Sequence, residues 1–102
     1  MKKLLTCMLT VTWLLWASAW AGDAAAGKSK AASCIGCHGM AGVSANPAWP
    51  NLAGQHGDYL VKQMKDFKAG TRTDPNMNAL MAPLSEADMA DIAAYFSSLD
   101  CK

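Results

Sequence analysis

The feature that most constrains this chain is the segment SCIGCHG at residues 33–39, in which Cys34 and Cys37 stand three apart and His38 follows directly. Such a pair can form a disulfide, a thiol redox pair, part of a zinc site or an attachment point for haem. A disulfide here would close a very small loop, gain little entropy and leave His38 unexplained. A thioredoxin-like pair needs a strand–helix context, and no strand pattern is present.

A structural zinc site needs four ligands, whereas only Cys34, Cys37 and His38 cluster, with His56 in a loop and Cys101 near the C-terminus. The spacing C-x-x-C-H is, by contrast, the attachment sequence of c-type haem. One helical turn presents two sulfurs to the two vinyl groups, and the next residue directs its imidazole at the iron. The motif therefore predicts one covalent haem c, held by both cysteines and ligated by the Nε2 of a neutral His38.

The N-terminal residues have the pattern of an export signal. Two lysines precede an apolar run, and Ala19 and Ala21 supply the small residues that a signal peptidase needs. The run is too short for a comfortable membrane span, so an uncleaved anchor is the weaker alternative. We expect cleavage after about Ala21, with Ala19 as a second possible site, which leaves residues 22–102 as a single domain in the periplasm with no stable membrane insertion.

The mature chain is small and nearly neutral. Residues 22–102 hold seven basic and eight acidic side chains, a formal charge of −1, and no basic run that would favour nucleic acid. They are rich in alanine and poor in large aliphatic residues. Because a chain of this size buries little apolar surface, it commonly recruits a cofactor or metal for stability. Cys101 is left over, either as an incidental thiol or as the link of a dimer.

The pattern along the chain predicts an all-α fold of three or more helices. Asp23 is a candidate N-cap for a first helix over about residues 24–33, Gly70 ends a second that starts at Asp58, and the S-x-x-D sequence from Ser85 to Asp88 starts the last. Residues 39–57 and 71–83 are predicted to be irregular because they are rich in turn residues. Such long loops need a surface to pack on, which haem would provide.

The residues alone leave several candidates for the second axial ligand. Met40 is too close to His38, and Met64 and Met89 lie on apolar helix faces where core packing explains them. Met77 and Met81 both lie in the segment before the last helix, from which a thioether could reach the iron. The remaining candidates are therefore Met77, Met81 and, less favoured, His56.

Three segments together resemble class I c-type cytochromes, within them the periplasmic cytochrome c4 and monohaem cytochrome c553 group. They are GDAAAGKSKAASCIGCHG, PNLAGQHGDYLVKQMKDFKAGTRTDP and MAPLSEADMADIAAYFSSL. The resemblance implies a small cytochrome c fold wrapped around one haem. It implies that Met77, eight residues before Ser85, is the iron ligand with Met81 as the alternative, that the Pro50 carbonyl accepts from His38, and that Gly27 allows the first and last helices to cross near Ile92 and Tyr95. With a single C-x-x-C-H, one haem is expected.

The function that this resemblance implies is one-electron transfer by a soluble periplasmic carrier that is not an enzyme. Expected partners are redox proteins of a respiratory chain, such as a membrane cytochrome complex and a terminal oxidase or reductase. Lys62, Lys65 and Lys68 either steer docking or form the solvated face of an amphipathic helix, the favoured interpretation. The alternatives are a haem subunit bound tightly to a periplasmic oxidoreductase, and a ligand-sensing or peroxidatic haem protein.

Overall fold

The computed structural model of this 102-residue chain describes residues 22–101; the predicted signal peptide and its cleavage site at Ala21 lie outside them. Over the described residues the protein is built of helices and loops without strands, which confirms the predicted all-α class. None of the helices in this part of the chain is long and apolar enough to span a membrane. The elements are α1 (Ala24–Lys30), η1 (Ala31–Ser33), α2 (Ile35–His38), α3 (Gly57–Ala69), α4 (Pro75–Met81) and α5 (Glu86–Ser97).

The predicted helix boundaries agree closely with the structure. The Asp23 carboxylate caps α1 by accepting from the amides of Ala25 and Ala26, and the helix narrows into the 3-10 turn η1 before Cys34. Helix α3 ends at Gly70, whose φ of 81° is left-handed. Helix α5 begins with a complete capping box, because Ser85 and Asp88 each accept a hydrogen bond from the other's main-chain N–H.

Helix α4 corrects the prediction that residues 71–83 are irregular throughout. Pro75 occupies the first turn of the helix, where a missing N–H costs nothing, and the Asp74 side chain accepts from the amides of Asn76 and Met77 at 3.0 Å each. The sequence Asp74-Pro75 is therefore a helix start and not part of an irregular segment.

The first and last helices of the domain pack closely against each other. A Cβ on Gly27 would lie 1.9 Å from the main-chain oxygen of Asp91 and 3.0 Å from the Cβ of Tyr95, so only glycine allows this approach. Polar contacts reinforce the crossing: Lys30 Nζ pairs with Asp91 at 2.6 Å and with Asp88 at 2.9 Å. The expected close contact between these helices, with Gly27 at its centre, is confirmed.

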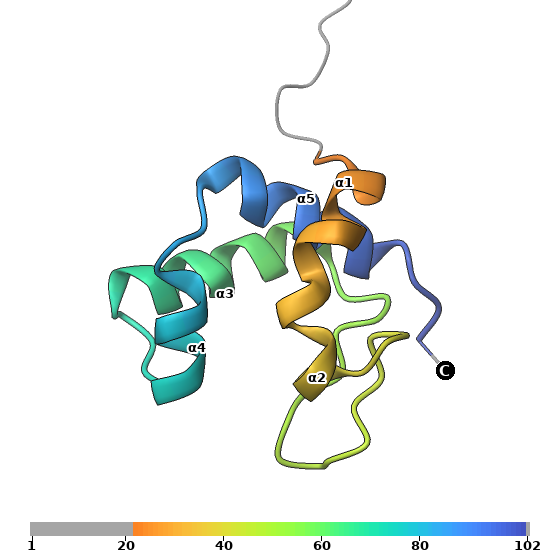
Figure 1. Cartoon of the computed structure of the whole chain (residues 1–102), viewed down its shortest axis with the longest axis horizontal. Coiled ribbons are helices and arrows are strands. Elements are labelled where there is room, and N and C mark those ends of the chain that lie inside the picture. The colour runs from red at the N-terminus through yellow and green to blue at the C-terminus, as the bar shows by residue number, and fades with distance from the viewer. Residues whose placement is uncertain (1–21, 102) are drawn as a thin grey trace, which may run out of the picture.

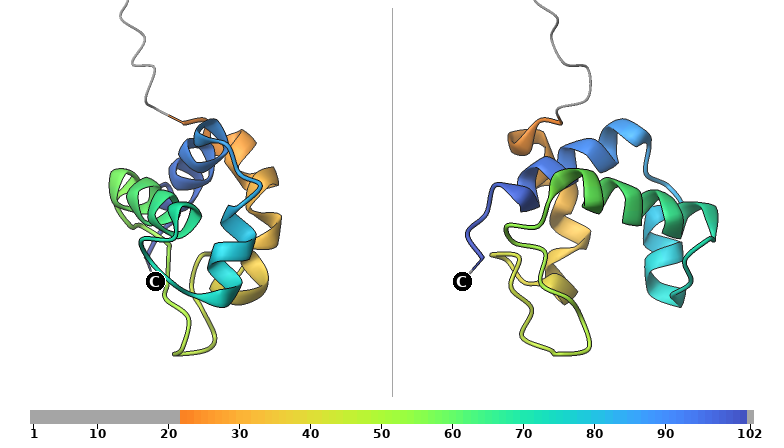
Figure 2. Two further views of the ribbon diagram at one scale, coloured as in Figure 1. Left: turned by 90° about the vertical axis from the view of Figure 1, so that its left-hand side faces the viewer. Right: turned by 180° about the vertical axis from the view of Figure 1, so that it is seen from behind.

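The core lies where α3 and α5 meet. Figures 1 and 2 show these two helices side by side, with α1 and α2 descending on one side, α4 on the other and the long loop of residues 39–56 below. Met64 on α3 and Met89 on α5, which the sequence assigned to core packing, are both buried. The buried apolar side chains of this cluster are Ala31, Leu60, Met64, Phe67, Met81, Met89, Ile92, Ala93 and Phe96.

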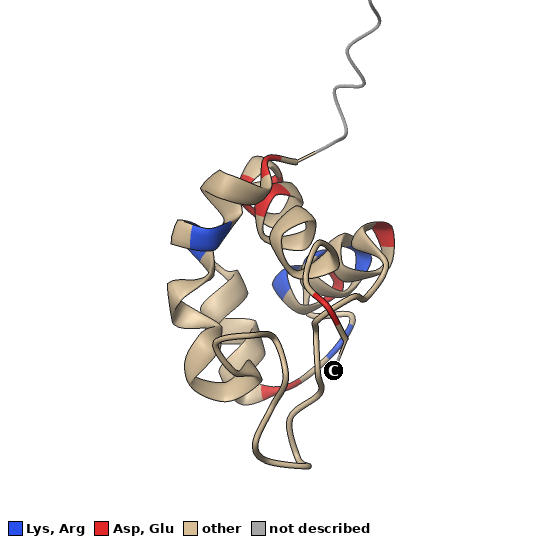
Figure 3. Ribbon diagram, turned by 90° about the vertical axis from the view of Figure 1, so that its right-hand side faces the viewer, with Lys and Arg blue, Asp and Glu red and all other residues tan. Residues whose placement is uncertain are grey.

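The long loop is held together by hydrogen bonds rather than by a core of its own. Gly42 O accepts from the amides of Leu52 and Ala53 at 2.8 and 3.0 Å, and Ser44 N–H donates to Asn51 Oδ1 at 2.7 Å. Residues 31–57 contain no Asp, Glu, Lys or Arg. Figure 3 shows the result, a loop without charged residues beneath helices that carry both signs.

Candidate functional site

A cavity of about 370 Å³ opens between α2 and the long loop on one side and α4 on the other, beneath α3 and α5. Its wall is mainly apolar, with core residues such as Leu60, Phe67 and Phe96 at its back. This volume is in the range of cofactor-sized protein pockets, about 300–1,000 Å³. The predicted site residues that line it are Cys34, Cys37, His38, Pro50 and Met77, together with Met81.

The C-x-x-C-H segment forms one turn of helix, as predicted. Cys34 precedes α2 as its N-cap, and Cys37 and His38 lie within it, so all three side chains reach the same cavity. Both cysteines are free thiols and half-buried. Burial raises the pKa of the Cys34 thiol, because the thiolate would lose hydration there. Over residues 22–101, no three His, Cys, Asp or Glu side chains gather as a metal site built from those residues would require.

His38 is the buried polar residue of the described chain, 7% exposed, and its ring orientation is set by the loop. Its Nδ1 lies 2.8 Å from the Pro50 carbonyl oxygen. A carbonyl can only accept, so Nδ1 carries a hydrogen and Nε2 is the ring nitrogen left to act as a ligand. The loop is in turn attached to α2, since Ser44 Oγ donates to Cys37 O at 3.1 Å.

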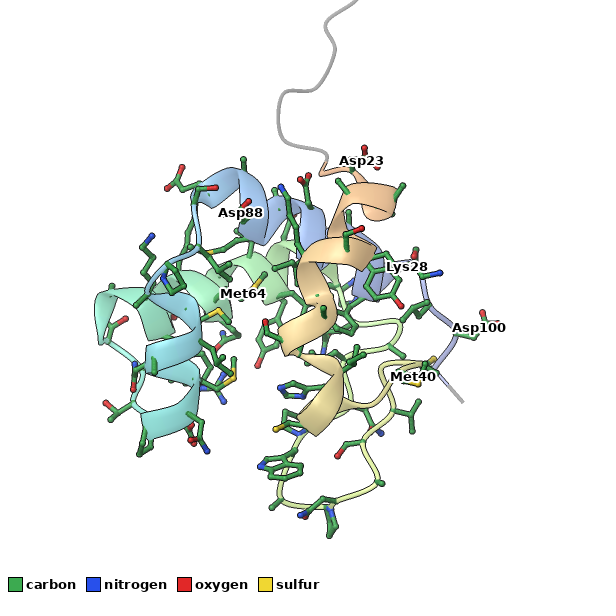
Figure 4. The ribbon with its side chains drawn as sticks, viewed as in Figure 1. Asp23, Lys28, Met40, Met64, Asp88 and Asp100 are labelled. Atoms are coloured by element: carbon green, nitrogen blue, oxygen red, sulfur yellow. The ribbon has the colours of Figure 1, made fainter. Side chains whose placement is uncertain are left out.

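Met77 and Met81 share one face of α4, four residues apart, and both line the cavity. Met81 is 2% exposed and belongs to the core cluster, whereas Met77 is half-buried and packs at the edge of that cluster. His56 is exposed just before α3 and is not among the residues that line the cavity. Figure 4 shows Met64 between α4 and α1, and Met40 on the far side of α2 from α4.

The three lysines of α3 are all engaged within the domain. Lys62 pairs with Asp66 one helical turn away at 2.7 Å, and Lys65 lies 3.5 Å from the Glu86 carboxylate. Lys68 Nζ donates to the main-chain oxygen of Leu84. These contacts agree with the favoured interpretation, in which the lysines form the solvated face of an amphipathic helix.

The aromatic residues Trp49 and Tyr59 also line the cavity and are 40% and 50% exposed. The lining includes a further residue that the sequence did not indicate as functional. Arg72 lies there with its guanidinium carbon 4.5 Å from the centroid of the Phe67 ring, and it donates to Gln63 Oε1 at 2.7 Å. Arg72 stands in a polar, turn-rich segment, where no periodicity distinguishes a cavity residue from a solvated one.

The fold and this site define a c-type cytochrome. Residues 24–100 match the family described as Cytochrome c, and the chain belongs to this family. It is 52% identical over 98 residues to cytochrome c4 of Pseudomonas aeruginosa, with 96% of this chain and 49% of that protein covered. It is 49% identical over 82 residues to cytochrome c-554(548) of Halomonas halodenitrificans, with 76% and 98% covered.

Solved structures agree. The structure described as reduced recombinant cytochrome c4 from Pseudomonas stutzeri superposes with a TM-score of 0.75 at 47% identity, covering 78% of this chain and 47% of that one. The chain thus spans about half the length of the cytochrome c4 proteins that it matches. The predicted family and the small cytochrome c fold are confirmed.

A cytochrome c domain implies covalently bound haem c with its iron, and Cys34 and Cys37 fit the C-x-x-C-H attachment motif. The cavity's chemistry suits this group. Two thiols lie next to an imidazole with a free Nε2, thioether sulfurs lie across the cavity on α4, and the wall between them is apolar. Arg72 at the rim is a cation that suits the carboxylates of haem.

Proposed function

We propose that this protein is a soluble, periplasmic, single-haem electron carrier that cycles between Fe(II) and Fe(III). One observation carries the proposal: Cys34, Cys37 and His38 from α2 and Met77 from α4 converge on one apolar cavity. The haem, once bound, supplies reversible one-electron chemistry at its iron. The remaining question is what each side chain contributes.

The residues divide into attachment, ligation and orientation. Cys34 and Cys37 would hold the group through thioether bonds, and His38 would ligate the iron through Nε2. The Pro50 carbonyl accepts from His38 Nδ1, which fixes the tautomer and increases the donor strength of the ring. Met77 provides the second ligand, a thioether that favours the ferrous state and a high potential. The half-buried position of Met77, compared with the fully packed Met81, supports this choice.

With His38 and Met77 both bound to it, the iron would keep no open position for a substrate, so we infer that the protein is not an enzyme. Its partners are other redox proteins, such as a membrane cytochrome complex and a terminal oxidase or reductase, with which it meets briefly. Residues 1–21 are proposed to direct export and to be removed, after about Ala21. The uncharged stretch over residues 31–57 favours contacts with partners that depend little on salt.

The test is an optical spectrum of the purified protein in both oxidation states, with a denaturing gel stained for haem. Covalent attachment gives a stained band, and the weak red charge-transfer band of ferric iron reports sulfur ligation. Met77→Ala should abolish the red band, whereas Met81→Ala and the exposed control Met40→Ala should retain it. Loss of the band with Met81→Ala alone would overturn the assignment of Met77.

The same preparation separates the alternatives. Rapid carbon monoxide binding by the native reduced protein would favour a ligand-sensing or peroxidatic role, because it requires an open or labile sixth position. Co-purification with a catalytic subunit would favour a permanently bound haem subunit. Slow carbon monoxide binding by a protein that purifies alone is the result expected of a carrier.

A further inference from the structure

The amide of Asn78 fastens helix α4 to the end of α3. Its Nδ2 donates to the main-chain oxygen of Phe67 at 2.7 Å and to that of Arg72 at 2.9 Å, and its Oδ1 accepts from the Asp74 amide at 2.8 Å. Two of these partners are carbonyls and the third is an N–H, so the orientation of the amide is fixed and both of its N–H donors are used. A single side chain thus ties together α3, the connecting turn and α4.

Helix α4 depends on such contacts. It has only seven residues, too few for a helix to be stable in water without tertiary packing. Residues 68–73, which precede the helix, are exposed. After its C-terminal end, the carbonyl of Leu84 accepts a hydrogen bond from Lys68 Nζ. The Asn78 bonds to Phe67 and Asp74 are half-buried, where a hydrogen bond contributes more than on the surface.

Asn78 also follows Met77 directly in the chain. Its three hydrogen bonds fix the backbone at residue 78, and with it the position and rotation of the first turn of α4 relative to α3. They therefore also fix the point from which the Met77 side chain reaches the cavity. The Asp74 carboxylate, which accepts from the Met77 amide at 3.0 Å, fixes the same turn from its other side.

We propose that Asn78 is a positioning residue that holds the Met77 thioether against the iron. In this role it prevents competing ligands from replacing the Met77 sulfur on the metal. This inference rests on the proposed role of Met77. Asn78 itself touches main chain only and contributes through the placement of its neighbour.

The experiment compares Asn78→Leu, of similar shape and without polar atoms, with the wild-type holoprotein. In the variant the reduced protein should bind carbon monoxide at least about tenfold faster, because loss of ordinary hydrogen bonds changes an opening equilibrium by an order of magnitude or more. Its ferric red band should fade on heating well below the unfolding temperature measured by circular dichroism. If Asn78 had a merely structural role, its replacement would lower the unfolding temperature only. Carbon monoxide would then bind at the wild-type rate, and the red band would persist up to the lowered unfolding temperature.

Two further variants complete the comparison. Thr71→Val removes the bond from Thr71 Oγ1 to Asp66 O in the same turn but leaves the Asn78 contacts, so it should bind carbon monoxide at the wild-type rate. If Asn78→Leu does not fold, Asn78→Ser replaces it, since serine is too short to reach both carbonyls. Wild-type carbon monoxide rates and a red band that persists up to unfolding in the folded Asn78 variant would overturn the proposal.

Met77→Ala, prepared in parallel, shows which inference fails. If it keeps the red band, Met77 is not the ligand, and the role of Asn78 is overturned with it. If it loses the band while the Asn78 variants behave as wild type, the ligand assignment holds and only the positioning role is overturned.

Discussion

The Nδ1 of His38 and the carbonyl oxygen of Pro50 lie 2.8 Å apart, although the two residues are twelve positions apart along an uncharged loop. The loop holds this carbonyl in place through its own contacts, above all the 2.7 Å bond from Ser44 N–H to Asn51 Oδ1 beside Pro50. The orientation of the imidazole is therefore determined by a segment that has no secondary structure of its own.

Asn51→Ala should raise the reduction potential. Without its side chain the loop loosens, the Pro50 carbonyl accepts more weakly from His38, and the imidazole donates less electron density to ferric iron. The measurement is a spectroscopic redox titration. Pro47→Ala, in the same loop, leaves the Ser44–Asn51 and His38–Pro50 bonds in place and should keep the wild-type potential. A potential that falls or stays constant in Asn51→Ala would contradict this account.

Gly27→Ala should destabilise the domain. The new Cβ would overlap the main chain of Asp91, so α1 and α5 must separate, and overpacking of this kind costs on the order of 1–3 kcal/mol or more in unfolding free energy. Denaturant unfolding monitored by circular dichroism measures the loss. Lys28→Ala, at an exposed position of the same helix, is the matched control and should change stability little. Equal stability of Gly27→Ala and wild type would mean that the helices do not cross as described.

Acid should weaken the domain partly through Asp88. Its pKa is lowered to about 2 because its carboxylate accepts from the Ser85 amide and pairs with Lys30. A carboxyl with a lowered folded-state pKa adds stability above its ordinary pKa of about 4, and this stability is lost as pH falls from there to about 2. Unfolding midpoints measured across this range should therefore fall more steeply for wild type than for Asp88→Asn. If the unfolding midpoints of the two proteins fell in parallel with pH, Asp88 would not contribute to the loss of stability in acid.

Cys101 is an exposed free thiol. We expect air-oxidised protein to run partly as a dimer on a non-reducing gel and as a monomer after reduction, because an exposed thiol in an oxidising compartment can form a disulfide with a second copy. Cys101→Ser should give a monomer under both conditions. A dimer that persists in this variant would have another origin.

The sequence was sufficient to predict the elements whose signals are local. Asp23 and the Ser85–Asp88 pair mark helix starts by their own hydrogen bonds, and the apolar positions of α3 and α5 repeat at the helical period, so these predictions hold. The C-x-x-C-H motif predicted the haem because its spacing within one turn is itself the chemical requirement. The residues that hold the haem stay a prediction until a spectrum tests them.

Helix α4 and the partners of Asn78 and Lys65 depend on tertiary contacts and were not predicted. Helix α4 is short, and three of its seven residues are of types typical of turns. Only the pair Asp74-Pro75 indicates its start. Asn78 has no local signal, because its partners on Phe67 and Arg72 come from another helix and a turn. Lys65 likewise meets Glu86 only after the chain has folded.

The crossing of α1 and α5 joins distant parts of the chain: Lys30 and Asp91 are 61 positions apart, and Asp23 and Asp91 are 68 apart. Closing so long a loop costs chain entropy, and only the contacts between α1 and the final helix α5 offset this cost. During synthesis, the Cys34–His38 segment therefore emerges well before α5, the helix that completes its scaffold. Its thiols are open to reaction throughout that interval, so we expect haem attachment to be able to precede tertiary closure.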